Sequence, residues 1–392
     1  MFKKILGSIN IKDKYNDISF LILLSIIILL IFWFPIDFEN KKNDDSIRVK
    51  GIITEVDNTN VQQFEIVKTG SQAIKAKILK GKFKGKNITA VNNLLGRLEF
   101  DKIFVKGEKV LIVLNLNKEH NKIIAANVID HYRINIEIIL LLIFILFILI
   151  FAGWTGFKAV FSFLFTAIII WKILLPLFLQ GYNPIFISLL ILSFITSVII
   201  FLIGGFTKKG LVAFLGAITG VALTCLFSLI FGKLFHINGA IKPFTETLLY
   251  SGFAHLDITQ IFLSGIFIAS SGAVMDIAMD IAASQNEVIF KKPNISRKNL
   301  ILSGFSVGKA VVGTMTTTLL LAYSGGFTAL LMVFIAQGTP IMNIFNINYV
   351  AGEILHILIG SFGLVLVAPL TAIFGGFIFI KHNNTSNKIE VF

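Results

Sequence analysis

Long apolar runs are the feature that most restricts how this chain can fold. From Ile136 to Ile380 the chain consists largely of such runs, separated by short polar loops. A helix of about 20 residues crosses the roughly 30 Å of hydrocarbon in a bilayer, and a segment in lipid has to satisfy its own backbone hydrogen bonds. The composition agrees, with 55% hydrophobic and 15% charged residues and a mean hydropathy of +0.84. The chain is therefore predicted to be an integral membrane protein.

About eight spans are expected after Ile136, and a further one lies near the N-terminus. The last stretch contains Pro369, so a broken or re-entrant helix is the alternative there. Residues 233–257 could enter the membrane without crossing it. The expected spans cover residues 136–153, 158–180, 184–205, 210–232, 258–286, 300–323, 327–346 and 350–380. Residues 136–381 are thus predicted to form a multi-helix transmembrane domain, which a polar tail at 382–392 follows.

Residues 1–36 are expected to form a cytoplasmic tail and the first transmembrane helix. The tail is basic, and the apolar run from Ile18 to Pro35 ends in Phe-Trp-Phe before the proline. This run is longer than the core of a secretory signal, and aromatic residues mark membrane interfaces. The positive-inside rule places the N-terminus on the inner side of the membrane. The expected inner loops hold Lys158, Lys208, Lys209, Lys291, Lys292, Arg297 and Lys298.

Residues 37–135 form the longest polar segment and show the alternation of β-strands. Ile74, Ala76 and Ile78 alternate with polar neighbours, and residues 110–116 repeat the pattern. Glycine and asparagine clusters mark turns between about five or six short strands. The segment is predicted to be a small all-β domain with an OB-like or SH3-like barrel. Because one helix precedes it, we expect this domain outside the membrane.

Ionisable residues inside the expected spans are the sharpest indication of function, because charge in a membrane is costly and usually functional. Asp276 and Asp280 share a sector of roughly 80° with Glu287, at 100° per residue. Small residues continue this face, which allows close approach of another backbone. Those small residues are Gly265, Ala269, Gly272 and Ala283.

Two further spans carry polar residues. Lys309, Thr316 and Thr317 lie on one helix, and Glu353 and His356 lie at helical spacing on another. We expect these groups to share a depth with the two aspartates and to form a transport or ion-binding centre. The alternatives are an ion pair between Asp276 and Lys309 that locks two helices, and solvated or interfacial positions for Glu287, Glu353 and His356. A metal site built from Asp276, Asp280, Glu353 and His356 is left open.

Several classes of function are disfavoured. The chain lacks the metalloprotease His-Glu-x-x-His, the Gly-x-Ser-x-Gly elbow and a phosphate-binding glycine loop, so no enzymatic activity and no cofactor are expected. Its single cysteine, Cys225, cannot form an internal disulfide. The net charge of +13 is spread along the chain, whereas a nucleic-acid-binding protein concentrates basic charge on one face. The expected partners are the lipid bilayer, a small solute or cation, and an envelope or membrane protein.

The chain resembles the YibE/F-like family of bacterial multi-spanning membrane proteins. The transmembrane resemblance lies in residues 272–288 (GAVMDIAMDIAASQNEV), 308–326 (GKAVVGTMTTTLLLAYSGG) and 353–372 (EILHILIGSFGLVLVAPLTA). Residues 77–96 and 106–114 are similar to the family's extracytoplasmic domain. The second motif departs from the family pattern, because Ala310 stands where an acid is usual and Thr317 where an asparagine is common. The resemblance implies the fold and location and carries no settled biochemical activity.

The leading hypothesis is a gradient-driven permease or channel-like transporter of a small solute or ion. In it, Asp276, Asp280 and Lys309 form the coupling centre, and Glu353 and His356 act as a proton or cation relay. The alternative is a non-transporting cell-envelope factor, whose membrane bundle anchors the outer β domain and docks a partner protein.

Overall fold

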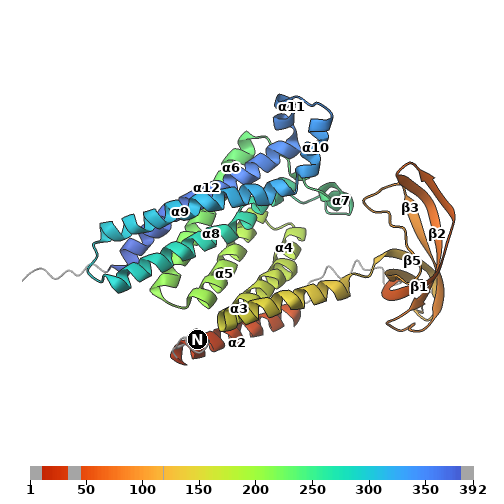
Figure 1. The fold of residues 1–392 in the computed structure, drawn as a ribbon, viewed down its shortest axis with the longest axis horizontal. Coiled ribbons are helices and arrows are strands. Elements are labelled where there is room, and N and C mark those ends of the chain that lie inside the picture. The colour runs from red at the N-terminus through yellow and green to blue at the C-terminus, as the bar shows by residue number, and fades with distance from the viewer. Residues whose placement is uncertain (1–10, 34–45, 118, 381–392) are drawn as a thin grey trace, which may run out of the picture. The chain divides into compact units, whose positions relative to one another are not determined.

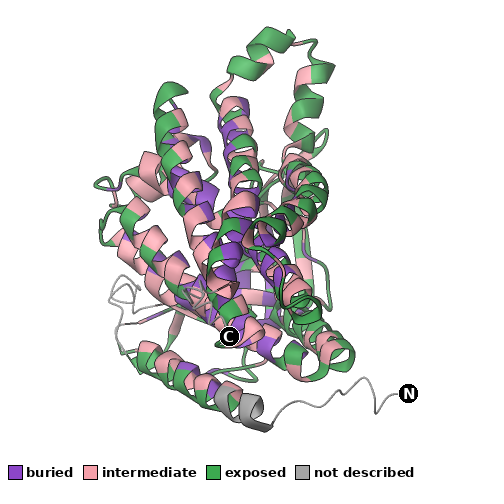
Figure 2. Cartoon of the chain, turned by 90° about the vertical axis from the view of Figure 1, so that its left-hand side faces the viewer, coloured by how far each residue is buried: buried purple, intermediate pink, exposed green. Residues whose placement is uncertain are grey.

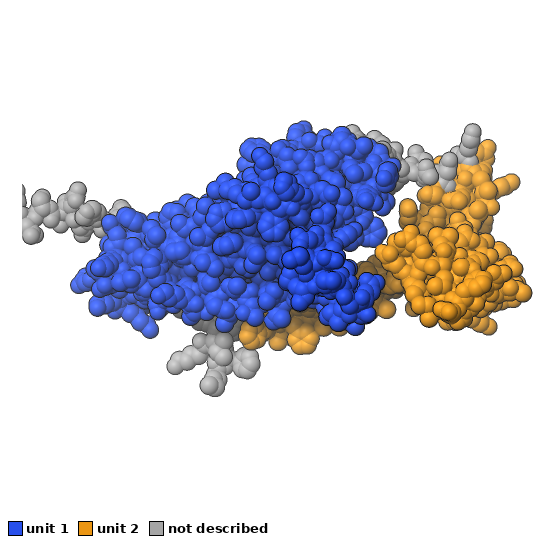
Figure 3. All heavy atoms as spheres, turned by 90° about the horizontal axis from the view of Figure 1, so that it is seen from above, with its two compact units in different colours: residues 1–36, 152–392 blue, residues 37–151 orange. Residues whose placement is uncertain are grey.

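The computed structural model describes residues 11–33, 46–117 and 119–380. The expected basic tail at residues 1–10 and the polar tail at 382–392 lie outside these ranges. The chain divides into two compact units, residues 1–36 with 152–392 and residues 37–151 (Figure 3). Each unit is described by itself below.

Five strands form a closed barrel in the smaller unit, as the alternation predicted. They are β1 (Ser46–Phe64), β2 (Val67–Ile78), β3 (Asn87–Leu95), β4 (Lys109–Leu116) and β5 (Ile123–His131). Their order around the barrel is β1-β2-β3-β5-β4, and neighbours are antiparallel except β3 and β5. Ile74, Ala76 and Ile78 of β2 are at most 1% exposed, because every second residue of a strand faces the same side.

The barrel closes at a seam between β3 and β5, where Val91 pairs with Asn127. Beside it the buried amide of Gln72 accepts hydrogen bonds from the Phe104 N–H (2.9 Å) and the Asn92 side chain (2.8 Å). The same amide donates to the Phe104 carbonyl at 3.1 Å, and Asn92 donates to the Lys102 carbonyl at 2.7 Å. Side-chain amides therefore fasten the segment before β4 to strands β2 and β3.

The larger unit is helical (Figure 1). Its long helices are α2 (Ile11–Trp33), α3 (Ile134–Ile169, which begins in the smaller unit), α5 (Pro184–Gly204), α6 (Lys208–Leu234), α8 (Ile258–Lys291), α9 (Arg297–Gly325) and α12 (Asn348–Phe379). Its short elements are η2 (Ile170–Leu174), α4 (Leu175–Leu179), η3 (Gly239–Ile241), α7 (Thr245–Tyr250), α10 (Thr328–Ala336) and α11 (Ile341–Asn346).

Six helical segments among the described residues are long and apolar enough to cross a membrane. The expected count of eight or nine spans is not confirmed. The spans expected at 136–153 and 158–180 belong to one helical segment of 46 residues, Ile134–Leu179, which Gly153 interrupts with φ 52° and ψ −123°. The span expected at 327–346 consists of α10 and α11, with 9 and 6 residues. Gly338, at φ 64°, and Pro340 interrupt it, because neither residue favours a continuing helix.

Two further expectations are settled by the helices themselves. Pro369 lies inside α12 without ending it, so residues 348–379 form one helix and no re-entrant loop. Lys158, expected in an inner loop, lies inside α3 and is 8% exposed. Its Nζ is 2.9 Å from the Asp17 carboxylate of α2, and this ion pair makes the burial of the lysine tolerable.

The main core of the larger unit lies between α5, α6, α8 and α12, and α9 adds Leu319 to it. Figure 2 shows the buried residues on the inner sides of the helices. Gly352 of α12 lies against Phe262 of α8, and further along Gly363 lies against Val274, so these two helices run parallel. Helices α6 and α9 run antiparallel to them. Gly216 of α6 lies so close to Thr371 of α12 that a Cβ would overlap its hydroxyl. Small residues thus set the helix spacing, as is common in membrane bundles.

Candidate functional site

One face of α8 carries the two aspartates and is not packed against the bundle. Asp276 and Asp280 are exposed, whereas Ile277, Ala278 and Ile281 on the other side are fully buried. The shared face predicted from helical periodicity is therefore confirmed. At Gly265 and Gly272 on the same face, no other described part of the chain lies within 4 Å of the place where a Cβ would stand, so this side of the helix is open at both glycines.

Neither aspartate forms a hydrogen bond or an ion pair through its side chain with the described part of the chain. Lys309 of α9 is also exposed and makes no ion pair with another described residue, so the alternative of a bridge between Asp276 and Lys309 is not observed. Lys309 instead lines a cavity of about 280 Å³ between α9 and α12. Ile281, next to Asp280, lies against Gly308, so Asp280 and Lys309 occupy similar positions along the bundle.

The remaining candidates on these two helices contribute less. Thr316 is half-buried and donates its hydroxyl to the Val312 carbonyl of its own helix at 2.8 Å. Thr317 is exposed on α9, and Glu287 is exposed near the end of α8. Of these residues, only Glu287 adds to the acidic face of α8. Together with Asp276 and Asp280, it gives this side of the helix three carboxylates.

Glu353 and His356 do not share the depth of the aspartates, contrary to the expectation. They lie near the start of α12, where Gly352 contacts Phe262 of α8. Asp276 follows Phe262 by 14 residues of helix, or about 21 Å at 1.5 Å per residue. The physical reason is that residues 327–346 do not cross the bundle, so α12 begins on the side where α9 ends.

Glu353 instead forms an ion pair that the sequence did not indicate. Its side chain is 9% exposed, and its Oε2 lies 3.1 Å from the Nζ of Lys242. Lys242 precedes α7 and also lies 5.6 Å from the ring centroids of Phe262 and Phe327. A lysine between a buried carboxylate and two aromatic faces is held in place by charge and by cation–π attraction.

His356 lies beside this pair with an unusual environment. Both ring nitrogens are buried and have no hydrogen-bond partner among the described residues. The ring packs at 4.4 Å between centroids against Tyr323 of α9, tilted by 33°. Buried polar atoms are normally hydrogen-bonded, so an orphaned imidazole points to a partner that is bound only at times, such as water or a ligand.

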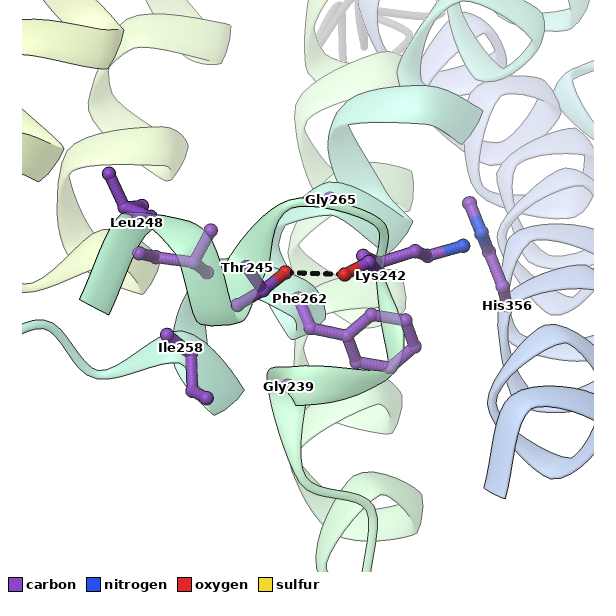
Figure 4. A pocket seen from close by; sticks show the side chains of 9 residues that line it. Gly239, Lys242, Thr245, Leu248, Ile258, Phe262, Gly265 and His356 are labelled. Atoms are coloured by element: carbon purple, nitrogen blue, oxygen red, sulfur yellow. Dashed lines mark hydrogen bonds between the residues drawn. The ribbon is translucent and has the colours of Figure 1, made fainter. Parts of the chain in front are cut away.

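A cavity of about 200 Å³ opens beside these groups. Figure 4 shows the Lys242 side chain reaching toward the His356 ring, with Phe262 below it. The hydroxyl of Thr245 donates to the Lys242 carbonyl at 2.8 Å. The cavity is lined by Gly239, Lys242, Thr245, Leu248, Ile258, Ile261, Phe262, Gly265 and His356. Gly265 therefore belongs both to this cavity and to the open face of α8.

A metal centre from the four proposed ligands is not formed. Asp276 and Asp280 lie far along α8 from Glu353 and His356, and the described residues contain no cluster of three or more His, Cys, Asp or Glu side chains suited to a metal ion. Lys242 and Tyr323 are the members of the site that sequence reasoning missed. The one available signal was that residues 233–257 were expected to approach the membrane.

Two family models match the chain. A model described as YibE/F-like protein matches residues 140–381, and one described as YibE/F family N-terminal domain matches residues 46–131. The two matches fall on the helices and on the barrel, respectively. No curated protein and no solved structure matches.

Proposed function

This chain belongs to the YibE/F-like family, and from that premise we propose that it is a gradient-driven permease or channel-like transporter of a small solute or ion. The observation that supports this proposal most is the open face of α8. It begins at Gly265 in the cavity, passes Asp276 and Asp280, and ends at Glu287. A continuous unpacked strip of small and acidic residues suits the wall of a polar path through a membrane.

The electrostatics of this strip support the same proposal. A carboxylate within a membrane-spanning helix is expensive unless it meets water, a cation or a partner group. Asp276 and Asp280 are exposed, and their carboxylates have no hydrogen-bond or ion-pair partner among the described residues. Water and a passing cation would satisfy both side chains, and the small side chains of Ala269 and Gly272 leave room for them.

The residues then take distinct roles in the proposal. Asp276 and Asp280 bind the coupling cation or proton, and Lys309 sets the local charge at the same depth. Glu353 and His356 lie too far from the aspartates for a direct relay. We assign His356 to the cavity at the other end of the strip, and Glu353 to holding Lys242 beside it. The protein would reside in a bacterial cytoplasmic membrane, with its N-terminus inside and the barrel outside.

Proteoliposome flux tests the proposal. A potassium diffusion potential is imposed across the membrane. Proton entry is followed with an internal pH-sensitive dye, and sodium entry with an internal sodium-sensitive dye. We expect Asp276→Asn and Asp280→Asn to slow wild-type flux at least 10-fold, while Glu137→Gln, on the exposed first turn of α3, leaves it unchanged. Equal flux in wild type and in both aspartate variants would eliminate this assignment.

The proposed orientation needs its own test. In a Cys225→Ser background, Lys84→Cys places a thiol in an exposed barrel turn, and Lys209→Cys places one at the start of α6. A membrane-impermeant maleimide added to intact cells should label only Lys84→Cys. Labelling of Lys209→Cys alone would invert the topology.

The second candidate function is a non-transporting envelope factor. Its support is the same open face, because no other described part of the chain lies within 4 Å of the place where a Cβ of Gly265 or Gly272 would stand. Such small residues also dock helices of other proteins. On this view the face is covered by protein and stays dry. Water access to the face therefore separates the two functions.

A further inference from the structure

We propose that the cavity beside Lys242 and His356 is a binding site for a small carboxylate that carries an apolar body. The site goes beyond the proposed transport, because binding at equilibrium requires no flux. Gly265 in the cavity precedes Asp276 by 11 residues, or about 16 Å of helix, so the cavity is separate from the acidic centre.

The walls of the cavity select an apolar body. Leu248, Ile258, Ile261 and Phe262 line it, and the absence of a side chain at Gly265 gives it room. The volume is about 200 Å³, and an apolar cavity of roughly 150 Å³ is enough to hold benzene. The ligand body is therefore about the size of one six-membered ring.

The polar groups of the cavity select an acceptor. The Lys242 ammonium has three N–H donors, and it donates to the Glu353 carboxylate at 3.1 Å. Its side chain is 37% exposed, and Lys242 is one of the residues that line the cavity. In its neutral form the His356 ring supplies one N–H donor, and its two nitrogens have no partner among the described residues.

The charge presented to the cavity favours an anion over a cation. Lys242 lines the cavity, whereas Glu353 lies behind it, is 9% exposed and is not a lining residue. A carboxylate is an acceptor with two oxygens, and charge-assisted hydrogen bonds from an ammonium are stronger than neutral ones. One oxygen facing Lys242 and the other facing His356 would match the two groups that Figure 4 shows converging.

Isothermal titration of the purified full chain in detergent tests the site with four probes: benzoate, benzyl alcohol, benzylamine and acetate. Benzoate has both the charge and the ring, and each other probe lacks one or changes its sign. We expect benzoate to bind at least 10-fold more tightly than the other three. Equal binding of benzyl alcohol or benzylamine would overturn the carboxylate assignment, and equal binding of acetate would overturn the apolar body.

Two variants locate the binding. The double variant Lys242→Gln/Glu353→Gln removes the cation without leaving a buried charge unpaired, and it should weaken benzoate binding at least 10-fold. Gly265→Val meets no atom within 4 Å at its Cβ and fills part of the cavity, so it should also abolish binding. Gly272→Val is the matched control, because that glycine is equally open two turns along α8 but does not line the cavity.

The variants keep the inference falsifiable if one of them does not fold. Thermal unfolding of each protein identifies a folding defect, and Gly265→Val alone is sufficient to place the ligand. Benzoate binding that persists in a folded Gly265→Val protein would remove the ligand from this cavity. Benzoate binding without any ion flux would contradict the transport proposal and leave this inference intact. Ion flux without benzoate binding would contradict this inference and leave the transport proposal intact.

Discussion

The Nζ of Lys242 lies 3.1 Å from the Oε2 of Glu353, although 111 residues separate them in sequence. The two partners differ in burial, because the lysine side chain is 37% exposed and the glutamate 9%. An unpaired Lys242 could turn its ammonium to water along its flexible stem. An unpaired Glu353 would remain a buried charge.

This asymmetry gives the first prediction. Lys242→Met should lower the free energy of unfolding by about 3 kcal/mol, as is typical when one partner of a buried pair is removed. Glu353→Gln should cost only about 1 kcal/mol, because the lysine can be hydrated. Denaturant titration in detergent micelles measures both values. A larger loss of unfolding free energy in Glu353→Gln than in Lys242→Met would contradict the finding that Glu353 is the more buried partner.

The second prediction concerns water on the open face of α8. In a Cys225→Ser background, Ala269→Cys and Ala283→Cys place thiols on that face, and Ala278→Cys and Ala282→Cys place them on the side that is 0% exposed. Thiolates form in water and react with charged methanethiosulfonates. We expect the first pair to react at least 10-fold faster than the second.

The outcome of this experiment also separates the two candidate functions. A path for ions has to be wet, so fast labelling at positions 269 and 283 would favour transport. Slow labelling at all four positions in the membrane would favour a face covered by a partner helix. Solubilised protein provides the control, because detergent releases partner helices that occlude the face.

The third prediction compares two glycines. A Cβ at Gly216 of α6 would overlap Thr371, whereas a Cβ at Gly313 of α9 meets nothing within 4 Å. Gly216→Val should therefore lower the free energy of unfolding by about 2 kcal/mol more than Gly313→Val, through overpacking. Both changes put the same residue into a helix, so effects of helix propensity cancel. Equal thermal midpoints would contradict the close packing of α6 and α12.

The fourth prediction concerns acid and the barrel. Partial burial of the Asp130 carboxyl disfavours its charge, but hydrogen bonds from Lys102, the His131 N–H and Arg133 outweigh it, so the pKa of Asp130 lies below its usual value. Backbone N–H groups of Leu95 and Arg97 likewise lower the pKa of Asp101. A carboxyl with a lowered folded pKa stabilises the domain above its unfolded pKa, near 4, and this stabilisation is lost as pH falls further.

Hydrogen exchange of barrel peptides in the full chain measures this effect, once rates are corrected for intrinsic chemistry. Protection should fall as the pH drops below about 4. Asp130→Asn should show a shallower fall and a loss of up to about 1 kcal/mol at pH 7. Glu65→Gln, at an exposed turn between β1 and β2, should follow the wild type. An unchanged pH profile in Asp130→Asn would show that other carboxyls dominate.

Local patterns in the sequence were enough to predict the barrel and the acidic face. Alternation in residues 74–78 reflects strand geometry, and the spacing of Asp276 and Asp280 reflects the turn of an α-helix. Both depend on residues close together in the chain. Hydropathy failed at 327–346, because the segment is apolar enough for a span but Gly338 and Pro340 divide it into two short helices.

Pairings between distant residues could not be predicted. Lys158 was assigned to a loop because it is charged, and nothing near it in sequence identifies Asp17, 141 residues away, as its partner. The pair of Lys242 and Glu353 likewise leaves no periodic pattern in the sequence, because its two members lie far apart in the chain. The predicted depth of Glu353 and His356 depends on how many helices cross the membrane before α12. Counting residues 327–346 as a span places both residues at the opposite end of the helix bundle.

The seam of the barrel has a consequence for how that domain opens. Most of its strand pairs are long antiparallel ladders, whereas β3 and β5 are paired at Val91 and Asn127. The amides of Gln72 and Asn92 hold the neighbouring segment before β4 to β2 and β3. Proteins open locally where few backbone hydrogen bonds hold them. Transient opening should therefore start at this seam. The backbone amide hydrogens of Phe104 and of the β3 edge that faces β5 should then exchange with solvent before those in the ladder between β1 and β2.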